Sequence, residues 1–226
     1  MGNHCAIARS PEPLVNVKKF NVGIIGYGWA ATAHIDAINA SGMAQVTNVY
    51  SSRLLDDDEL SSRHGSKITS TVNLKSMLKN PDIDVIDITS YPYQHADQVV
   101  AAAKAGKHII VEKPTFLKLT HLQNAYEFSK KKNLQIFPVF QNRYNLAVKR
   151  VKKAIDNNEL GKIHIISVRV RWCRPQRYYD MSPWRGTFSH DGGALANQGI
   201  HFIDLMKYLG GEISDTFCYM KTLGSK

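Results

Sequence analysis

The chain has few of the residues that mark disulfide-bonded and metal-binding proteins. Its three cysteines, Cys5, Cys173 and Cys218, are odd in number and widely spaced, and no two of them form a C-x-x-C pair. This pattern argues against a disulfide framework and against a zinc site, and it fits the reducing conditions of the cytoplasm. We therefore expect a cytoplasmic protein without a bound metal.

Long apolar runs are also missing from the sequence. No stretch approaches the ~20 apolar residues that a membrane span needs, and the N-terminus lacks the apolar core of a secretory signal. Residues 1–19, which contain Pro11 and Pro13, are predicted to form a flexible leader. A membrane partner is not expected.

Acidic residues are scarce relative to basic ones. The 19 Asp and Glu against 29 Lys and Arg give a formal net charge of +10, which fits a nucleic-acid partner, an anionic small substrate, or solubility alone. No nucleic-acid-binding motif is present, so a nucleic-acid partner is not expected. Residues 130–132, all lysine, end a helical pattern, where cations favour the helix dipole. The arginines of "VRVRWCRPQR" are therefore the better candidates for an anion site.

Short apolar runs alternate with helical patterns from residue 20 to about residue 142. The runs are "FNVGII", "QVTNVY", "DVIDITS", "HIIVEK" and "LQIFPVF". Such alternation predicts parallel strands joined by helical crossovers, with ligand sites at the carboxyl ends of the strands. We expect an α/β fold with a doubly wound Rossmann domain over residues 20–142. An incomplete α+β substrate domain with an open sheet is expected over residues 143–226.

A glycine turn follows the first of these runs. Gly26 and Gly28 belong to the pattern G-x-G-x-x-A in "GYGWAA", directly after a strand pattern and before a helical one. Such glycines allow a tight turn and the close approach of a pyrophosphate to a helix N-terminus. We predict a dinucleotide-binding loop formed by Gly26, Tyr27, Gly28, Trp29 and Ala30.

The second strand pattern bears on the choice of cofactor. It ends in "VYSSR", where Ser51 replaces the acidic residue that would hold the ribose hydroxyls of NAD, and Arg53 is placed to pair with a 2′-phosphate. The predicted cofactor is NAD or NADP, with a preference for NADP. Residues 56–58, all aspartate, are a rival for the ribose contact, but their place at the start of a helical pattern favours a role in its first turn.

Two patterns stand out after residue 143. The segment "KIHIISVRVRW" predicts a long strand over residues 162–172, with Arg169 and Arg171 on one face. The segment "GALANQGIHFIDLMKYLGG" predicts a helix that ends at Gly210.

The polar residues of this predicted helix fall on one stripe. Asn197, His201, Asp204 and Tyr208 are spaced i, i+4, i+7 and i+11, among apolar neighbours. A core helix whose histidine and aspartate satisfy each other is one explanation. A wall of a catalytic cavity is the other, because histidine titrates near neutrality and can act as a general base.

The strand pattern "HIIV" stops abruptly at Glu112, Lys113 and Pro114. The simplest explanation is that the charges mark the point where the chain reaches water, and that proline closes the strand because it has no N–H to donate. In a parallel sheet, however, that point lies at the edge where the ligand binds. Lys113 is then a candidate for the site, aimed by Pro114 through a cis peptide bond.

Four segments together resemble the family of glucose-fructose oxidoreductase, inositol dehydrogenase and MocA. They are the glycine turn at residues 26–31, "EKP" at 112–114, "QNRYN" at 141–145 and "GALANQGIHFID" at 193–204. Within the family, "RPQRYYD", "PWRGT" and "NQGIH" are most similar to UDP-N-acetyl-glucosaminuronate 3-dehydrogenases of lipopolysaccharide and O-antigen synthesis. The resemblance covers nearly the whole chain from residue 20.

The resemblance implies an NAD(P)-dependent oxidation of a secondary alcohol of a sugar. The family's catalytic lysine and histidine match Lys113 and His201, and Asn197 stands where the family often has aspartate. His201 is then the base and Lys113 stabilises the developing alkoxide, while Glu112 fixes the position and charge of the lysine. For a nucleotide-sugar acid, arginines offer paired donors to carboxylate and diphosphate.

Further residues are expected at the two halves of the site. On the cofactor side they are Ser90, His95, Glu112, Lys113, Gln141 and Arg143. On the substrate side, together with Lys113, they are Arg171, Arg174, Tyr179, Trp184, Arg185, Asn197, Gln198 and His201.

The sequence departs from the family pattern in places. Leu146 replaces a usual proline, and Asp191 replaces a glycine before "GGAL", where it is expected to reshape the loop over the substrate. Family members also continue well beyond residue 226. An alternative function is therefore a truncated, non-catalytic dinucleotide-binding or scaffold protein. Homo-oligomers are expected to form through the sheet of the second domain.

Overall fold

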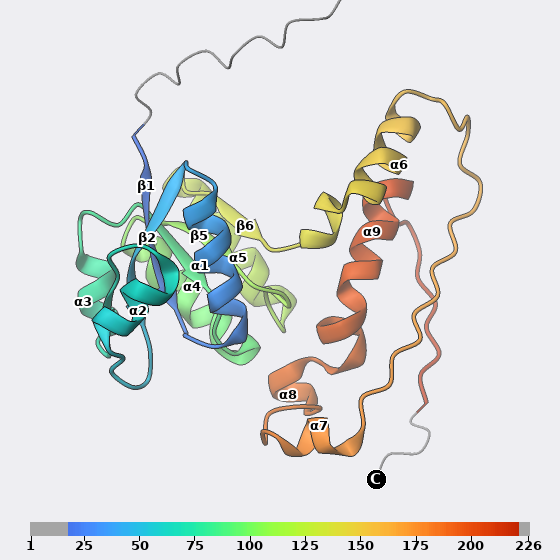
Figure 1. Ribbon diagram of the computed structural model, residues 1–226. Helices are drawn as coiled ribbons and strands as arrows, with labels where there is room; N and C mark the ends of the chain where they lie inside the picture. The colour runs from blue at the N-terminus through green and yellow to red at the C-terminus, as the bar shows by residue number, and fades with distance from the viewer. Residues whose placement is uncertain (1–17, 222–226) are drawn as a thin grey trace, which may run out of the picture.

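A six-stranded parallel sheet forms the core of the first half of the chain (Figure 1). The computed structural model describes residues 18–221. The strands are β1 (Phe20–Ile25), β2 (Ala44–Tyr50), β3 (Thr69–Thr71), β4 (Val85–Ile88), β5 (His108–Val111) and β6 (Ile136–Pro138). Their order is β3-β2-β1-β4-β5-β6, and every neighbouring pair is parallel. The predicted doubly wound sheet is confirmed, and the strand order reverses between β1 and β4.

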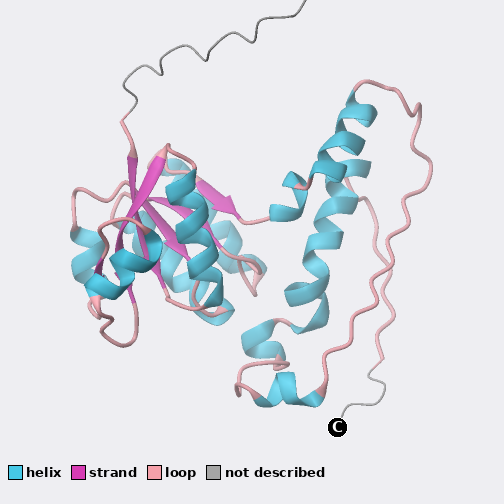
Figure 2. Cartoon of the chain, viewed as in Figure 1, coloured by secondary structure: helices cyan, strands magenta, loops and turns pink. Residues whose placement is uncertain are grey.

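Helices flank this sheet (Figure 2). They are α1 (Trp29–Ala40), α2 (Asp57–His64), α3 (Leu74–Lys79), α4 (His95–Lys104) and α5 (Leu119–Lys131), with a short 3-10 turn, η1 (Pro92–Gln94). Strand β1 faces both layers: Val22 and Ile24 pack in a core with α1 and α2, whereas Ile25 packs in a second core with α4 and α5. Burial on both sides explains why the strands read as continuous apolar runs.

The chain then enters a smaller helical unit (Figure 1). Its elements are η2 (Gln141–Tyr144), α6 (Leu146–Asp156), α7 (Gln176–Asp180), α8 (Phe188–Asp191), the π-helical turn η3 (Leu195–Gly199) and α9 (Ile200–Gly210). Helix α9 ends at Gly210 as predicted and lies beside α6. Within residues 18–221, no helix is long and apolar enough to cross a lipid bilayer.

The strand predicted over residues 162–172 is wrong for the described chain. This segment is extended but pairs with no other strand within residues 18–221. It packs against α9 instead, with Ile166 against Gly210 and the Trp172 ring 6.1 Å from that of Phe202. Alternation alone cannot make a strand, because backbone N–H and C=O groups need a neighbouring strand to bond.

Strand β3 and the predicted leader remain to be compared with the structure. Strand β3 was missed, because three residues of Thr and Ser form too short a run to register as an apolar pattern. The flexible leader falls on residues 1–19, of which only residues 18 and 19 lie within the described chain.

The same substitution is predicted to have effects of very different size at a buried and at an exposed isoleucine. Ile109 on β5 is 0% exposed, whereas Ile165 in the unpaired segment is 84% exposed. Ile109→Ala should lower the free energy of unfolding by about 3 kcal/mol through lost contacts and a cavity. Ile165→Ala, the matched control, should change it by less than about 0.5 kcal/mol. Urea unfolding of both variants tests this, and a comparable loss in Ile165→Ala would contradict the exposure of the Ile165 side chain.

Candidate functional site

The glycine turn lies at the reversal point of the sheet. Gly26 follows β1 with φ of +94°, a conformation that L side chains rarely adopt. A Cβ there would also meet the main chain of Ser90 at 3.0 Å. Its N–H donates to the carbonyl of Tyr50 on the neighbouring strand (2.9 Å). The turn is therefore packed between the ends of β2 and β4 and accepts only glycine at this position.

Helix α1 presents an open N-terminus beside this turn. Its N-cap, Gly28, offers no side-chain bond, and the first turn holds no acidic residue. A Cβ on Gly28 would meet nothing within 4 Å, so there is room for a ligand against the main chain. Ala31, the small third residue of the pattern, is 0% exposed and packs against the sheet. Free amides at a helix N-terminus suit a phosphate, so these residues fit a dinucleotide.

The remaining predicted cofactor residues of the first half surround this turn. Trp29 is 90% exposed at the start of α1, whereas the Tyr27 hydroxyl bonds to Nε2 of His64 at 3.1 Å. Ser51 is buried, and its hydroxyl accepts the main-chain N–H of Arg53 at 3.4 Å. The Arg53 side chain is exposed.

The aspartate run after β2 begins a helix. Asp56 is the N-cap of α2, and its side chain accepts the amides of Asp58 and Glu59 at 2.9 Å each. Asp57 accepts the amide of Ser70 at 2.7 Å. The interpretation that this run forms the first turn of a helix is confirmed.

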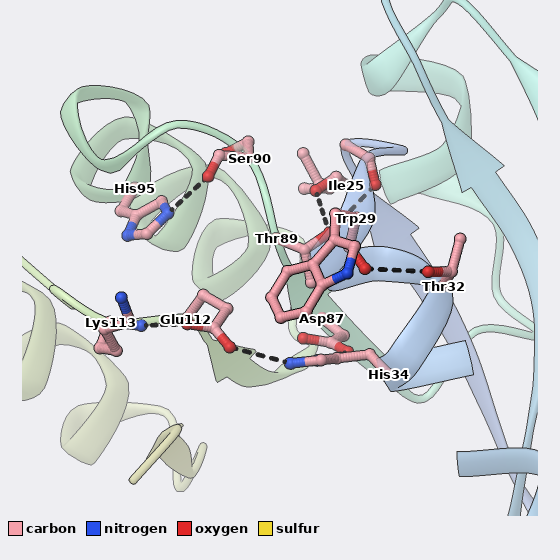
Figure 3. Close-up of polar contacts among 11 residues, drawn as sticks. Ile25, Trp29, Thr32, His34, Asp87, Thr89, Ser90, His95, Glu112 and Lys113 are labelled. Atoms are coloured by element: carbon pink, nitrogen blue, oxygen red, sulfur yellow. Dashed lines mark hydrogen bonds and ion pairs between the residues drawn. The ribbon is translucent and has the colours of Figure 1, made fainter. Parts of the chain in front are cut away.

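A histidine that sequence reasoning missed joins two strand ends (Figure 3). His34 of α1 lies 2.8 Å through Nδ1 from Asp87 Oδ2 on β4, and 3.1 Å through Nε2 from Glu112 Oε1 after β5. Burial alone would lower the pKa of His34, but the bonds to the two carboxylates outweigh it and raise the pKa to about 10. His34 lies on the inward stripe of α1 with Ala31 and Ile35. A polar residue on that apolar stripe was the available signal.

The two carboxyl groups respond differently to their surroundings. Burial raises the pKa of Asp87, and the bond to His34 opposes that rise. Burial also acts to raise the pKa of Glu112, but the bonds to His34 and to the Lys113 amide outweigh it and leave the pKa below its ordinary value. The His34 ring is therefore a cation that favours the ionised form of both carboxyl groups.

Lys113 reaches from the end of β5 to the helical unit. Its amine donates to the main-chain oxygen of Asn197 at 3.1 Å and to the side-chain oxygen at 3.3 Å. Its main-chain N–H donates to Glu112 Oε2 at 2.9 Å, so Glu112 holds the lysine's backbone rather than its amine. The peptide bond to Pro114 is cis, as predicted. Burial lowers the pKa of Lys113, while the charges of Glu112 and Asp191 oppose that fall.

Asp191 sets the orientation of Asn197. The Asn197 side-chain nitrogen bonds to Asp191 Oδ1, and Asp191 Oδ2 accepts the amide of Gly186 at 2.8 Å. The amide oxygen of Asn197 is thereby turned toward Lys113. The unusual aspartate before "GGAL" acts through this bond, and the π-helical turn η3 that carries Asn197 was not predicted.

His201 lies one turn after Asn197 on the same stripe. Its side chain is buried, and Nδ1 has no hydrogen-bond partner within residues 18–221. Burial and the nearby Lys113 charge lower the pKa of His201, against the opposing charges of Glu112 and Asp204. The ring is therefore neutral near pH 7 and has a nitrogen that can accept a proton.

The C-terminal half of the stripe, with Asp204 and Tyr208, is bound to Arg143 of η2. Arg143 donates through Nε to Asp204 Oδ2 at 2.7 Å and through a second nitrogen to Oδ1. Its guanidinium lies 5.0 Å from the Tyr208 ring centroid and 5.5 Å from that of Phe140. These contacts occupy Arg143, so it fastens α9 to the segment after β6 rather than facing a cofactor. Gln141, in the same turn, is exposed.

His95 lies behind the site rather than on its surface. The ring is 0% exposed, with Nδ1 2.9 Å from the carbonyl of Pro114 and Nε2 3.1 Å from that of Ser90. The Ser90 hydroxyl donates to Gln98 Oε1 at 2.5 Å. Burial lowers the pKa of His95. The predicted contact of His95 with a cofactor is replaced by a structural role, in which the ring ties together the loops after β4 and β5.

Basic and aromatic side chains gather on the helical unit near Asn197. The guanidinium groups of Arg174 and Arg185 lie 4.9 and 4.3 Å from the Tyr178 ring centroid. Arg174 also donates to Gln198 Oε1 at 3.4 Å, and the Trp184 ring lies 5.3 Å from the Tyr91 ring of the sheet domain. Within residues 18–221, neither of these arginines has a carboxylate partner.

Two predicted substrate residues differ in their placement. The Tyr179 ring packs against Gly186, next to this cluster. Arg171 lies in the unpaired segment, exposed, so the structure does not bring it to the cluster. Over the described part of the chain, no three His, Cys, Asp or Glu side chains are placed to hold a metal ion.

Comparison with known proteins places this arrangement in a family. Residues 20–140 match the family described as "Oxidoreductase family, NAD-binding Rossmann fold", and residues 148–226 match the "GFO/IDH/MocA C-terminal domain". The chain belongs to the GFO/IDH/MocA oxidoreductase family. The segment between the matched ranges, residues 141–147, is where the chain passes from the sheet domain to the helical unit.

Several relatives of known activity are similar to this family member. Levoglucosan dehydrogenase of Pseudarthrobacter phenanthrenivorans is 33% identical over 216 residues, which are 91% of this chain and 55% of that protein. Myo-inositol 2-dehydrogenase of Thermotoga maritima is 27% identical over 84% of this chain and 55% of that protein. The WlbA dehydrogenase of Bordetella pertussis, solved with NADH and UDP-GlcNAcA, superposes with a TM-score of 0.75 at 30% identity, over 86% of this chain and 59% of that one. The chain thus spans little more than half the length of these relatives.

His34 makes the stability of this family member depend on pH. Its pKa is about 10 in the folded chain and about 6.5 unfolded. The stabilisation from its bound proton is therefore complete below pH 6.5 and is lost as the pH rises toward 10. At pH 6.5, His34→Gln should lower the free energy of unfolding by about 3 kcal/mol, because it leaves two buried carboxylates without their cation. The difference from the unsubstituted chain should shrink steadily up to pH 10. Chemical denaturation across that range measures it, and a difference independent of pH would mean that His34 is neutral.

Proposed function

We propose that this protein is an NAD(P)-dependent dehydrogenase that oxidises a secondary alcohol of a sugar. The observation that carries the proposal is that the Lys113 amine is bonded to Asn197 and lies close enough to His201 for its charge to lower the pKa of that histidine. Lys113 stands at the carboxyl edge of the sheet, and the same edge carries the glycine turn and the open N-terminus of α1. A cofactor site and an acid–base pair therefore share one edge of one sheet.

The dinucleotide would be held by the glycine turn. The amides of residues 28–30 would face the pyrophosphate, and Trp29 and Tyr27 would flank it. The nicotinamide, when bound, supplies the hydride-accepting carbon, so the chain itself has only to place the alcohol and handle its proton. The family match and the NADH-containing relative support NAD. Exposed Arg53 is the ground for the proposed preference for NADP.

His201 and Lys113 would divide the proton chemistry. A neutral His201 takes the hydroxyl proton of the substrate, as its lowered pKa allows. The Lys113 amine, held by Asn197, donates to the developing alkoxide. Asn197 thereby takes the part of a positioning residue for the lysine.

The proposed substrate is a UDP-N-acetyl-hexosaminuronic acid, oxidised at C3. Arg174 and Arg185 offer two guanidinium groups without carboxylate partners among the described residues, which suits a carboxylate or diphosphate. Tyr178 and Trp184 add flat surfaces for a sugar or base. The WlbA relative solved with UDP-GlcNAcA supports this choice. As part of the same proposal, the protein acts in the cytoplasm, contributes to lipopolysaccharide synthesis and forms homo-oligomers.

Calorimetric titration with NADH and NADPH tests the cofactor part. Saturable binding of at least one is expected, and tighter binding of NADPH would support the role of Arg53. Gly26→Ala should weaken binding at least tenfold, because the new Cβ meets the Ser90 main chain and strains the turn. Gly42→Ala, at a glycine with positive φ and open space, is the matched control for strain alone. No saturable binding to the unsubstituted chain would rule out the proposed function.

Turnover of UDP-GlcNAcA tests the catalytic part, with levoglucosan and myo-inositol as comparison substrates. Lys113→Ala should reduce kcat by a factor of about 100 or more, since it removes a donor to the alkoxide, while the affinity for NADH stays nearly unchanged. Lys118→Ala, a nearby exposed lysine, is the control. Unchanged turnover in Lys113→Ala would refute the assignment. Binding of NADH without oxidation of any alcohol would instead favour the non-catalytic alternative.

A further inference from the structure

His34 bridges two carboxyl groups that come from different strands. Its side chain is 15% exposed, while those of Asp87 and Glu112 are 0% and 16% exposed. Ionised carboxylate oxygens only accept hydrogen bonds, so each ring nitrogen that faces one must carry a proton. The geometry therefore describes an imidazolium that donates to Asp87 at 2.8 Å and to Glu112 at 3.1 Å.

The two carboxylate oxygens of Glu112 accept hydrogen bonds from two different residues. Oε1 accepts from His34, and Oε2 accepts from the main-chain N–H of Lys113 at 2.9 Å. Figure 3 shows the resulting row of Lys113, Glu112 and His34, with Asp87 next to the His34 ring. The orientation of Glu112 is fixed from both ends, and the backbone from which the Lys113 side chain extends is fixed with it.

The row has alternating charge, from Asp87 through His34 and Glu112 to Lys113. Without the cation, two buried carboxylates would share one small space, and Asp87 Oδ1 already lacks a partner among the described residues. The bond to His34 and its charge are also the main influences that lower the pKa of Glu112, so without His34 both carboxyl groups take up protons more readily. A protonated Glu112 would cease to be the counter-charge of the Lys113 amine.

We propose that His34 is a positioning residue for Lys113, which keeps Glu112 ionised and holds it in the orientation that fixes the lysine. The inference rests on the proposed function, in which Lys113 is the donor to the alkoxide. His34 touches neither substrate nor cofactor in this role. It acts through Glu112 alone.

Other titratable groups also lie near Glu112 and set the background of its titration. They are Asp87 on β4, Lys113 next along the chain, His95 on α4 and His201 on α9. All of them are unchanged when His34 alone is replaced. A change in the protonation of Glu112 in such a variant therefore reports the loss of His34.

Carboxyl-carbon NMR of the full chain, labelled at glutamate Cδ, measures the titration of Glu112 directly. In His34→Gln, the proton affinity of Glu112 should rise tenfold or more. His64→Gln is the matched control, because it removes another buried histidine bonded to an aspartate, Asp36, and should leave Glu112 unchanged. His34→Asn removes the same charge and replaces His34→Gln if that variant does not fold. An unchanged titration of Glu112 overturns the proposal.

The pH dependence of kcat with UDP-GlcNAcA is the second readout. In His34→Gln, its acid limb should move to higher pH together with the Glu112 midpoint, while the NADH dissociation constant stays within twofold. A merely structural role would change stability and leave that limb in place, and this result also overturns the proposal. If the unsubstituted chain shows no turnover while Glu112 responds as expected, the proposed function fails and the link from His34 to Glu112 stands.

Discussion

The parallel pairing of β1, β4 and β5 brings distant parts of the sequence to one edge. Because the three strands run in the same direction, Ile25, Ile88 and Val111 end side by side. The glycine turn, the Ser90 loop and the Glu112-Lys113 pair are therefore neighbours, although more than eighty residues separate the first from the last. His34 and His95 tie these ends together from opposite sides, through carboxylates in one case and carbonyl oxygens in the other.

The helical unit meets this edge through polar and aromatic contacts. Lys113 bonds to Asn197, and Trp184 packs against Tyr91. Within the unit, Arg143 and Asp204 hold α9 in place, which leaves the next turn of the same stripe free to carry His201. One end of the polar stripe of α9 thus anchors the helix, and the other end carries the proposed base, His201.

The sequence was most informative where a residue type has few alternative uses. Gly26, with its positive φ and its contact with Ser90, and the end of β5 at Glu112 were predictable because turn chemistry and parallel topology leave little choice. The network around His34 was not, since the stripe of α1 that carries His34 does not show which carboxyl groups of distant strands it meets. The segment 162–172 was misjudged because its alternation fits a strand, while strand formation requires a partner that no local pattern supplies.

A crystal structure of the chain grown with NADH tests the central claim most directly, since that claim is spatial. The account predicts that the pyrophosphate lies against the amides of residues 28–30, at the N-terminus of α1. It also predicts that the nicotinamide end faces Lys113, with the lysine still bound to Asn197 and with His201 beside it. A dinucleotide bound elsewhere, or a Lys113 amine turned away from the nicotinamide, would contradict the account.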